Sequence, residues 1–450
     1  MLSDKEKSWR ERAERVISRV CDNFPSPDKF ENWNLCEELI LSAKSACEKG
    51  NEFEIETEDS AFLLNETAYF LKERADYLSA LPLYEKSLAI RKNVFGENHI
   101  ATAHSLDNLA LLHKELGQYE KAVYLCQLAL VIRRNELGEE HPYTVSSLNN
   151  LAELYRIKGE YEQALPLYNQ ALAIYEKSLS SNHPHIASSL NNLAELYRLQ
   201  GYYEEALPLF QRALTIREAV LGREHPDTAT SFNNMGMLHR SQGNNEQALF
   251  FHQQALAIRK KVLGEEHPDV AQSFNNLSGI YQSLGDYEQA ILLCQKSLTI
   301  REKILGIEHP DIAITLNNLA FLYKNQGNYQ QALVLYKRSL MIREKIFGLE
   351  HPSTAQSCNN LAALYDTQGE YSQALPLYQL ALTIREKVLG SDHLDTAISL
   401  NNLGMYYQSQ GEIELAFPLY ERATIIVKKI LGEQHPTYKI IYSNYLKLRK

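Results

Sequence analysis

Pairs of asparagines recur every 42 residues along most of the 450-residue chain and are its sharpest chemical feature. The second members of these pairs are Asn108, Asn150, Asn192, Asn234, Asn276, Asn318, Asn360 and Asn402. The pair that contains Asn108 is a variant, because its first member is Asp107. A side-chain amide offers both donors and an acceptor, so it can pair with a peptide backbone of any sequence. On a helical wheel this asparagine lies opposite the apolar stripe, beside the residues four before, three after and seven after it. We therefore expect it to face an open groove. The alternative is that one asparagine of each pair bonds a neighbouring helix and fixes the packing of the repeats.

The same predicted face varies from period to period, and this variation could encode specificity. Cations stand there in four successive periods, at Lys114, Arg156, Arg198 and Arg240. Glu153 and Glu195 lie three residues before two of them, so simple surface ion pairs are an alternative role. Farther along, Phe321 is apolar where a solvated helix should be polar, as are Ile314, Ile398 and Met405. These positions predict pockets for the side chains of a bound peptide, or else burial against the next turn of a superhelix.

Nine histidines also recur at this period, yet their spacing does not predict a metal site. They are His99, His141, His183, His225, His267, His309, His351, His393 and His435. Each lies in a different period, separated by helices about 10 Å wide, whereas metal ligands must converge within about 2 Å of one ion. We expect each histidine to stabilise a loop through a hydrogen bond. The recurrent arginines Arg91, Arg133, Arg217, Arg259, Arg301, Arg343 and Arg385 are interpreted as structural or solvent-facing.

No serine, cysteine or carboxylate interrupts the repeat as a grafted nucleophile would. The chain also contains no G-x-x-x-x-G-K-[ST] phosphate loop. The sequence therefore predicts no catalytic residue, no metal and no cofactor, and we expect the protein not to be an enzyme.

The elements that position these residues are two helices in each period. Apolar residues such as Leu148, Leu151, Ala152 and Tyr155 follow helical spacing before a glycine, and a second apolar helix follows the glycine. A glycine at this place supplies the left-handed residue that ends the first helix. Prolines within the second helix are expected in its first turns, at Pro82, Pro166, Pro208, Pro376 and Pro418. A single pair of helices cannot bury its apolar face, so the array must be stabilised by stacking. The fold class is therefore all-α, a solenoid of about nine helix pairs.

Residues 1–56 lie outside the clear repeat. Helical spacing covers 9–24 and 33–47, with Pro25 and Pro27 between them, and residues 51–60 form an expected acidic loop. The repeat array spans 57–450. Its first copy carries Ala75 where later copies carry glycine, and 436–450 is the expected closing helix.

The pattern Leu-Ala-x-Leu-Tyr, Gly-x-Tyr-x-x-Ala and a later alanine resembles the tetratricopeptide repeat. The 42-residue form with Asn-Asn-Leu-Ala and Leu-Gly-x-x-His-Pro is similar to kinesin light chains and to repeats at the C-terminal end of bacterial signalling ATPases. This resemblance implies a right-handed superhelical solenoid whose groove asparagines hold extended peptides. More weakly, residues 6–50 resemble the linker of bacterial STAND (NB-ARC-type) ATPases.

Composition narrows the class of partner. A formal net charge of −10 argues against a dedicated nucleic-acid binder, and no apolar run reaches the length of a membrane helix. Six cysteines form no disulfide framework, so we expect a cytoplasmic protein.

The leading hypothesis is a non-enzymatic scaffold that binds an extended peptide or a partner protein in its groove. The alternative is the sensor module of a STAND-type ATPase whose nucleotide-binding part lies elsewhere. A kinesin-like cargo adaptor is a third possibility, although residues 1–56 are too short for a sustained coiled coil. The sequence leaves the partner and the oligomeric state open.

Overall fold

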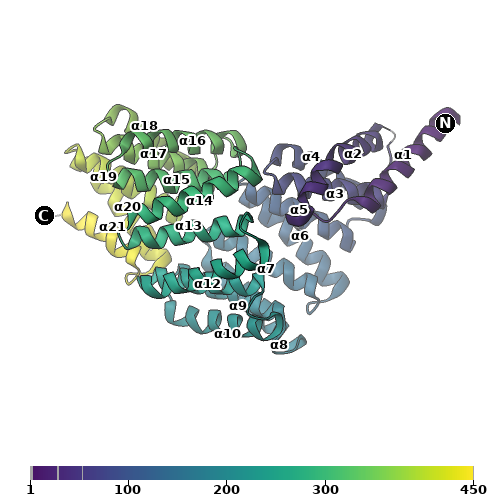
Figure 1. The fold of residues 1–450 in the computed structure, drawn as a ribbon, viewed down its shortest axis with the longest axis horizontal. Helices are drawn as coiled ribbons and strands as arrows, with labels where there is room; N and C mark the ends of the chain where they lie inside the picture. The colour runs from purple at the N-terminus through teal and green to yellow at the C-terminus, as the bar shows by residue number, and fades with distance from the viewer. Residues whose placement is uncertain (1–3, 28–29, 53, 449–450) are drawn as a thin grey trace. The chain divides into compact units, whose positions relative to one another are not determined.

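The computed structural model describes residues 4–27, 30–52 and 54–448, and every regular element in these ranges is a helix (Figure 1). The elements are α1 (Asp4–Asn23), the short 3-10 helix η1 (Phe30–Asn32), α2 (Trp33–Glu52), α3 (Glu58–Glu73), α4 (Tyr77–Phe95), α5 (Ile100–Glu115), α6 (Tyr119–Leu137), α7 (Pro142–Ile157), α8 (Tyr161–Ser178), α9 (Pro184–Leu199), α10 (Tyr203–Leu221), α11 (Pro226–Ser241), α12 (Asn245–Leu263), α13 (Pro268–Ser283), α14 (Tyr287–Leu305), α15 (Pro310–Asn325), α16 (Tyr329–Phe347), α17 (Pro352–Thr367), α18 (Tyr371–Leu389), α19 (Leu394–Ser409), α20 (Ile413–Leu431) and α21 (Pro436–Lys447).

The repeat produces helices in regular alternation. In the described part of the chain, from α3 to α20, a 16-residue helix is followed by one of 18 or 19 residues nine times over. This confirms the predicted all-α array of about nine helix pairs. Helix α21 follows the last pair, and residues 449–450 of the expected closing helix lie outside the described residues.

Small residues set the geometry within a pair. Gly201 has φ +82°, the left-handed conformation that ends α9, and in the first copy Ala75 adopts φ +59° at the same place. Ala206 on α10 is fully buried among Ala194, Phe210 and Met235, so a larger side chain there would push the helices apart.

Two sequence-based expectations about local structure were wrong. The recurrent prolines, such as Pro82 and Pro166, lie inside the second helices rather than in their first turns. The expected loop at 51–60 is shorter, because α2 continues to Glu52 and α3 already begins at Glu58. Thr57 and Ser60 form a capping box that fixes this early helix start.

Each periodic histidine caps the helix that follows it. In all nine cases the histidine Nδ1 accepts the backbone N–H of the residue two positions later, at 3.0–3.2 Å. The predicted loop-stabilising role of these histidines is therefore confirmed. Because Nδ1 is the acceptor, the cap needs an imidazole that carries no proton on that atom.

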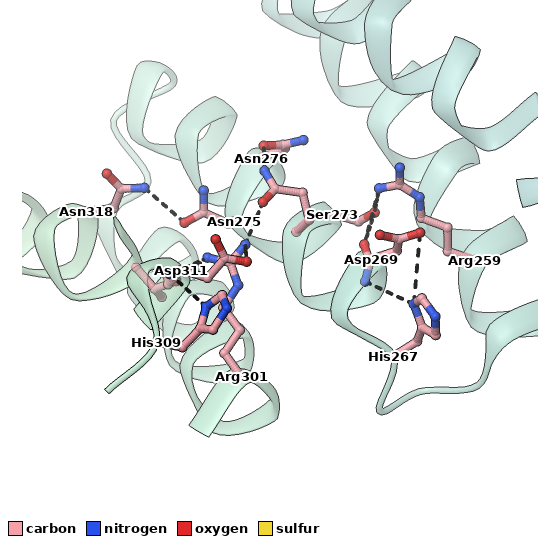
Figure 2. Close-up of polar contacts among 12 residues, drawn as sticks. Arg259, His267, Asp269, Ser273, Asn275, Asn276, Arg301, His309, Asp311 and Asn318 are labelled. Carbon is pink, nitrogen blue, oxygen red and sulfur yellow. Dashed lines mark hydrogen bonds and ion pairs between the residues drawn. The ribbon is translucent and has the colours of Figure 1, made fainter. Parts of the chain in front are cut away.

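The periodic arginines are buried and join each second helix to the next first helix. In seven junctions, the arginine NH1 donates to a backbone carbonyl ten residues later, at 2.7–3.3 Å, and to a hydroxyl fourteen residues later, at 2.6–3.0 Å. Figure 2 shows Arg259 bonded to Asp269 and Ser273 in one such arginine clamp, and the neighbouring Arg301 clamp beside His309. Of the two roles predicted for these arginines, the structural one is correct.

Two junctions lack the arginine clamp: Val427 stands at the arginine position before α21, and the α8–α9 junction departs further from the pattern. Tyr175 stands at the arginine position at the end of α8, and its ring stacks on His185 at 5.4 Å between centroids. The hydroxyl of Ser189, which would accept from an arginine, is buried and finds no partner among the described residues. The helix also ends at Leu179 rather than at a glycine. The α8–α9 junction therefore lacks the bonds that the described arginine clamps supply at seven other junctions.

The described contacts divide the chain into two compact units, Met1–Leu154 and Tyr155–Lys450. In the first unit, α1 and α2 share a core with α3 and α4 that includes Ile17, Ala43, Leu64 and Ile90. The repeat stacking therefore continues into the N-terminal helices without a separate core. The division at residue 56 remains a sequence-based prediction.

Loops far apart in sequence meet inside the second unit. His393 Nε2 donates to the carbonyl of Ile157 at 3.1 Å, a contact between residues 236 positions apart. The ring of His435 lies against Gly201, where a Cβ would come within 2.7 Å of the His435 Cδ2. Residues separated by more than five 42-residue periods are thus packed together, so these loops restrain the coil of the array.

Loss of an arginine clamp acceptor should destabilise the array. Ser231→Ala leaves Arg217 NH1 without its hydroxyl partner, and we expect a loss of about 1.5–3 kcal/mol, the usual worth of a hydrogen bond to a charged group. Ser189→Ala is the matched control, since its hydroxyl bonds nothing among the described residues, and should be neutral. Urea unfolding followed by circular dichroism measures both variants. Equal losses in the two would contradict the clamp.

A pair of glycine substitutions isolates the contact with His435. Gly201→Ala and Gly243→Ala both place alanine at a positive φ, which costs about 1–2 kcal/mol. Only at Gly201 does the new methyl also meet His435, because nothing lies within 4 Å at Gly243. We expect the Gly201 variant to have the lower urea midpoint. Identical midpoints would show that the two loops are not in contact in solution.

Acid should weaken the second unit. Burial lowers the pKa of His393 and of His435 in the folded protein. The unfolded chain, where histidine titrates near pH 6.5, then binds protons more readily, so stability is complete above about pH 6.5 and declines below it. Urea midpoints between about pH 7.5 and about pH 5.5 should fall, with a smaller slope in His393→Asn, which keeps a capping side chain that does not titrate. A flat profile would refute this coupling.

Candidate functional site

The second asparagines of four pairs hold neighbouring repeats together. Their Nδ2 groups donate to the side-chain carbonyl of the first residue in the preceding pair: Asn108 to Asn65 at 2.9 Å, Asn276 to Asn233 at 2.6 Å, Asn318 to Asn275 at 3.0 Å and Asn360 to Asn317 at 2.7 Å. Figure 2 shows the bond from Asn318 to Asn275 beside Asn276. In two cases a glutamine one turn earlier also donates to the amide oxygen. These amides are already engaged in packing.

The other four second asparagines make no hydrogen bond to any described residue. They are Asn150 in the first unit and Asn192, Asn234 and Asn402 in the second. Asn192 is exposed and the other three are half-buried. Their donors and acceptors are therefore available to a bound chain.

The hydrogen bonds between asparagines of neighbouring repeats are interrupted at Asn191. Five first asparagines accept from the following helix pair or closing helix, whereas the Oδ1 atoms of Asn149, Asn191 and Asn359 are buried without a partner in the described part of the chain. Asn191 is 6% exposed, and its Nδ2 also lacks a partner there. Asn234 is the second asparagine of the following repeat, but it makes no hydrogen bond to Asn191. Within the second unit, this hydrogen bonding between described repeats is therefore absent between α9 and α11, where Asn192 and Asn234 are free amides, and again between Asn359 and Asn402.

The predicted cations take different roles. Arg198 forms a two-pronged pair with Glu195, at 2.7 Å for both bonds, and also donates to Ser241 at 2.7 Å. Lys114 pairs with Glu115 at 3.1 Å, and Arg156 is half-buried. The Glu195–Arg198 pair fits the surface-pair alternative, which is worth a few tenths of a kcal/mol.

Arg240 differs from the others. Its guanidinium lies over Gly279 of the next repeat, where a Cβ would come within 2.7 Å of NH1. No carboxylate of a described residue pairs with it. Burial and, secondarily, the nearby Arg198 lower its pKa. The result is a partly buried cation without a compensating anion.

The apolar residues of this face remain accessible. Phe321 is 39% exposed, Ile314 42%, Ile398 37% and Met405 50%. They are not buried against another turn of the array, so this alternative is wrong. Ile314 and Phe321 lie on α15, and Ile398 and Met405 lie on α19.

The described residues offer little for covalent or metal chemistry. No group of three histidine, cysteine or acidic side chains among them could hold a metal ion. Cys126, Cys294 and Cys358 are buried, and burial raises the pKa of the Cys358 thiol to about 11. A thiol with so high a pKa stays protonated and is a poor nucleophile at neutral pH. No described helix is long and apolar enough to cross a membrane.

Comparison with known families matches this geometry. A tetratricopeptide repeat profile matches residues 59–125, 108–177, 185–261, 251–303, 269–345, 311–387, 368–429 and 395–448, and a second one matches 149–219. The chain belongs to the tetratricopeptide repeat family. Proteins of this family generally bind other proteins. A search of curated proteins found no match.

Solved structures resemble parts of this tetratricopeptide repeat protein. A putative kinesin light chain from Podosopora anserina with nearly identical TPR-like repeats is 30% identical, over 46% of this chain and 98% of that one, with a TM-score of 0.38. BtubC (BKLC) from P. vanneervenii is 27% identical, over 52% of this chain and 92% of that one, with a TM-score of 0.41. A Rap protein complexed with competence and sporulation factor is 16% identical, over 81% of this chain and 99% of that one, with a TM-score of 0.53. The resemblance of residues 6–50 to a STAND linker stays a prediction.

Proposed function

We propose that this tetratricopeptide repeat protein is a non-enzymatic scaffold that binds an extended peptide segment of a partner protein along α9 and α11. The observation that carries the proposal is the pair of unengaged amides at Asn192 and Asn234, in a family that generally binds proteins. Where neighbouring repeats use the equivalent amide to bond each other, these two keep their donors and acceptors for a ligand.

The peptide backbone supplies the matching groups. An extended chain presents an N–H and a C=O at every residue, so a single side-chain amide can bond both without reading the sequence. Asn192 and Asn234 stand one repeat apart on successive first helices, which favours a ligand that crosses from repeat to repeat. Sequence selection then depends on the other side chains of this face.

Arg240 supplies one such selective contact. Its half-buried guanidinium lacks an internal carboxylate, so an acidic side chain of the ligand would gain a charge-assisted bond there. Arg198 contributes less, since Glu195 already occupies two of its donors. The exposed Phe321 and Ile314 would hold apolar side chains where the ligand reaches α15.

The same proposal covers the wider set of candidate residues and the cellular setting. Asn402 offers a free amide on α19, and Asn150 offers one in the first unit. We further propose that the protein works in the cytoplasm without catalysis. All six cysteines are unpaired, which fits a reducing compartment.

The test begins with selection of twelve-residue peptides from a random phage library against the wild-type protein. Binding of the best synthetic peptide is then measured by fluorescence anisotropy on a variant carrying both Asn192→Ala and Asn234→Ala. Loss of two hydrogen bonds worth about 0.5–1.5 kcal/mol each predicts a Kd raised about 5- to 150-fold. Helicity should be unchanged, because neither amide bonds another described residue.

A variant with Asn276→Ala and Asn318→Ala is the matched control. These amides bond the preceding repeat, so their loss should lower the urea midpoint and leave the Kd within about twofold. The proposal fails if the selected peptide binds the Asn192/Asn234 variant as tightly as the wild type.

A further inference from the structure

A cavity of about 520 Å³ lies in the first unit and is lined by residues of α3–α7. Phe62, Arg91, His104, Arg133 and Tyr143 line it. Phe62, His104 and Tyr143 are exposed, so the cavity opens to solvent, whereas both arginines are buried. Its volume is within the range of about 300–1,000 Å³ typical of small-ligand sites.

Arg91 is an arginine clamp residue with one end unused. All its hydrogen bonds come from NH1, which contacts the Ala101 carbonyl at 3.3 Å, His104 Nδ1 at 3.2 Å and the Ser105 hydroxyl at 2.9 Å. Its NH2 has no partner among the described residues, and no carboxylate forms an ion pair with the group. Yet Arg91 is only 7% exposed.

In three other repeats the corresponding NH2 has an acceptor on the preceding first helix; Arg217 NH2 donates to Ser188 at 3.4 Å. Arg301 NH2 donates to Gln272 at 2.5 Å and Arg385 NH2 donates to Gln356 at 2.7 Å, in each case to the residue 29 positions earlier. The residue 29 positions before Arg91 is Phe62, which has no acceptor. The missing acceptor is thus replaced by the aromatic wall of the cavity.

A second guanidinium repeats the arrangement. Arg133 NH1 is bonded to Asp107, to the Tyr143 carbonyl at 3.1 Å and to the Ser147 hydroxyl at 2.6 Å, and its NH2 makes no hydrogen bond in the described structure. The Tyr143 ring lies 5.7 Å from its Cζ. Asp107 forms an ion pair with Arg133, whereas no carboxylate of a described residue forms one with Arg91.

Glu66 is the opposing charge in the lining. It accepts a hydrogen bond from Asn65, and no ion pair joins it to Arg91. Burial lowers the pKa of Arg91, and Glu66 and Glu58 act against that shift, so the guanidinium is kept charged. Glu66 stands one helical turn after Phe62 on α3, so both side chains contribute to the same side of the cavity lining.

We propose that this cavity binds a carboxylate attached to an aromatic or aliphatic group. The carboxylate accepts from Arg91 NH2, in the place that Gln272 and Gln356 take in other repeats, and the planar fork of a guanidinium suits a carboxylate. The apolar part of the ligand packs on Phe62 and Tyr143. The ligand is either a free organic acid or an acidic side chain next to an apolar one in a peptide.

Isothermal titration calorimetry on the full chain tests the proposal with two matched pairs of probes. One pair is 3-phenylpropionate and 3-phenylpropionamide, and the other is an end-blocked Gly-Gly-Glu-Phe-Gly-Gly peptide and its glutamine counterpart. The acid of at least one pair should bind about tenfold or more tightly than its amide, as expected for a hydrogen bond to a charged group. Preference in the first pair identifies a free acid as sufficient, and preference in the second alone identifies a peptide source.

Substitutions at Phe62 make the test specific. Phe62→Gln supplies the acceptor found in other repeats, so Arg91 NH2 becomes bonded internally and the acid should bind no better than the amide. Phe62→Leu keeps an apolar wall without an acceptor and should preserve the preference for the acid. Gln356→Leu, which removes the acceptor 29 positions before Arg385, is the control and should alter nothing at this cavity.

Equal binding of acid and amide in both pairs would overturn the proposal, as would full acid binding by a folded Phe62→Gln variant. Circular dichroism establishes that each variant is folded. The Asn192→Ala and Asn234→Ala variant should keep acid binding, so the outcome here is separable from that of the peptide site in the second unit.

Discussion

The arginine clamp is the interaction on which the stacking of repeats depends. A buried guanidinium joins the end of one second helix to a carbonyl and a hydroxyl at the start of the next first helix. In most junctions neutral oxygens rather than a carboxylate satisfy it, and only Arg133 has a buried acidic partner, Asp107, among the described clamps. A buried guanidinium that loses one of these hydrogen bonds would destabilise the fold. Each of these junctions is therefore held in one geometry.

Among the described residues, several departures from the regular bonding lie near α9 in the second unit. Tyr175 replaces the arginine before α9, Ser189 and Asn191 are buried without partners, and Asn192 and Asn234 are free. A polar group that bonds a neighbouring repeat is lost to a ligand, whereas one left unbonded is available to it. The same amide can therefore either hold two repeats together or bind a ligand. Which of the two it does differs from one repeat to the next.

The same competition explains the cavity of the first unit. The clamp arginine has two terminal nitrogens, and in three described clamps the second donates to a glutamine or serine side chain on the preceding first helix. Phe62 removes that acceptor without removing the arginine. One substitution in a repeat thus converts a packing group into an accessible donor, while the bonds from NH1 keep the junction intact.

The sequence by itself determined the period, the helix pairs, the glycine and alanine positions and the loop role of the histidines, because these follow from neighbours three, four and a few residues away. It also indicated which asparagine of each pair is directed away from the core stripe. It did not reveal that Asn276 and Asn318 are engaged while Asn192 and Asn234 are free, nor that Arg91 has an unused nitrogen. It also gave no sign that His393 meets Ile157. Those contacts join residues 29, 43 or 236 positions apart. They depend on the angle at which each repeat stacks on the last, and only the tertiary structure decides that angle.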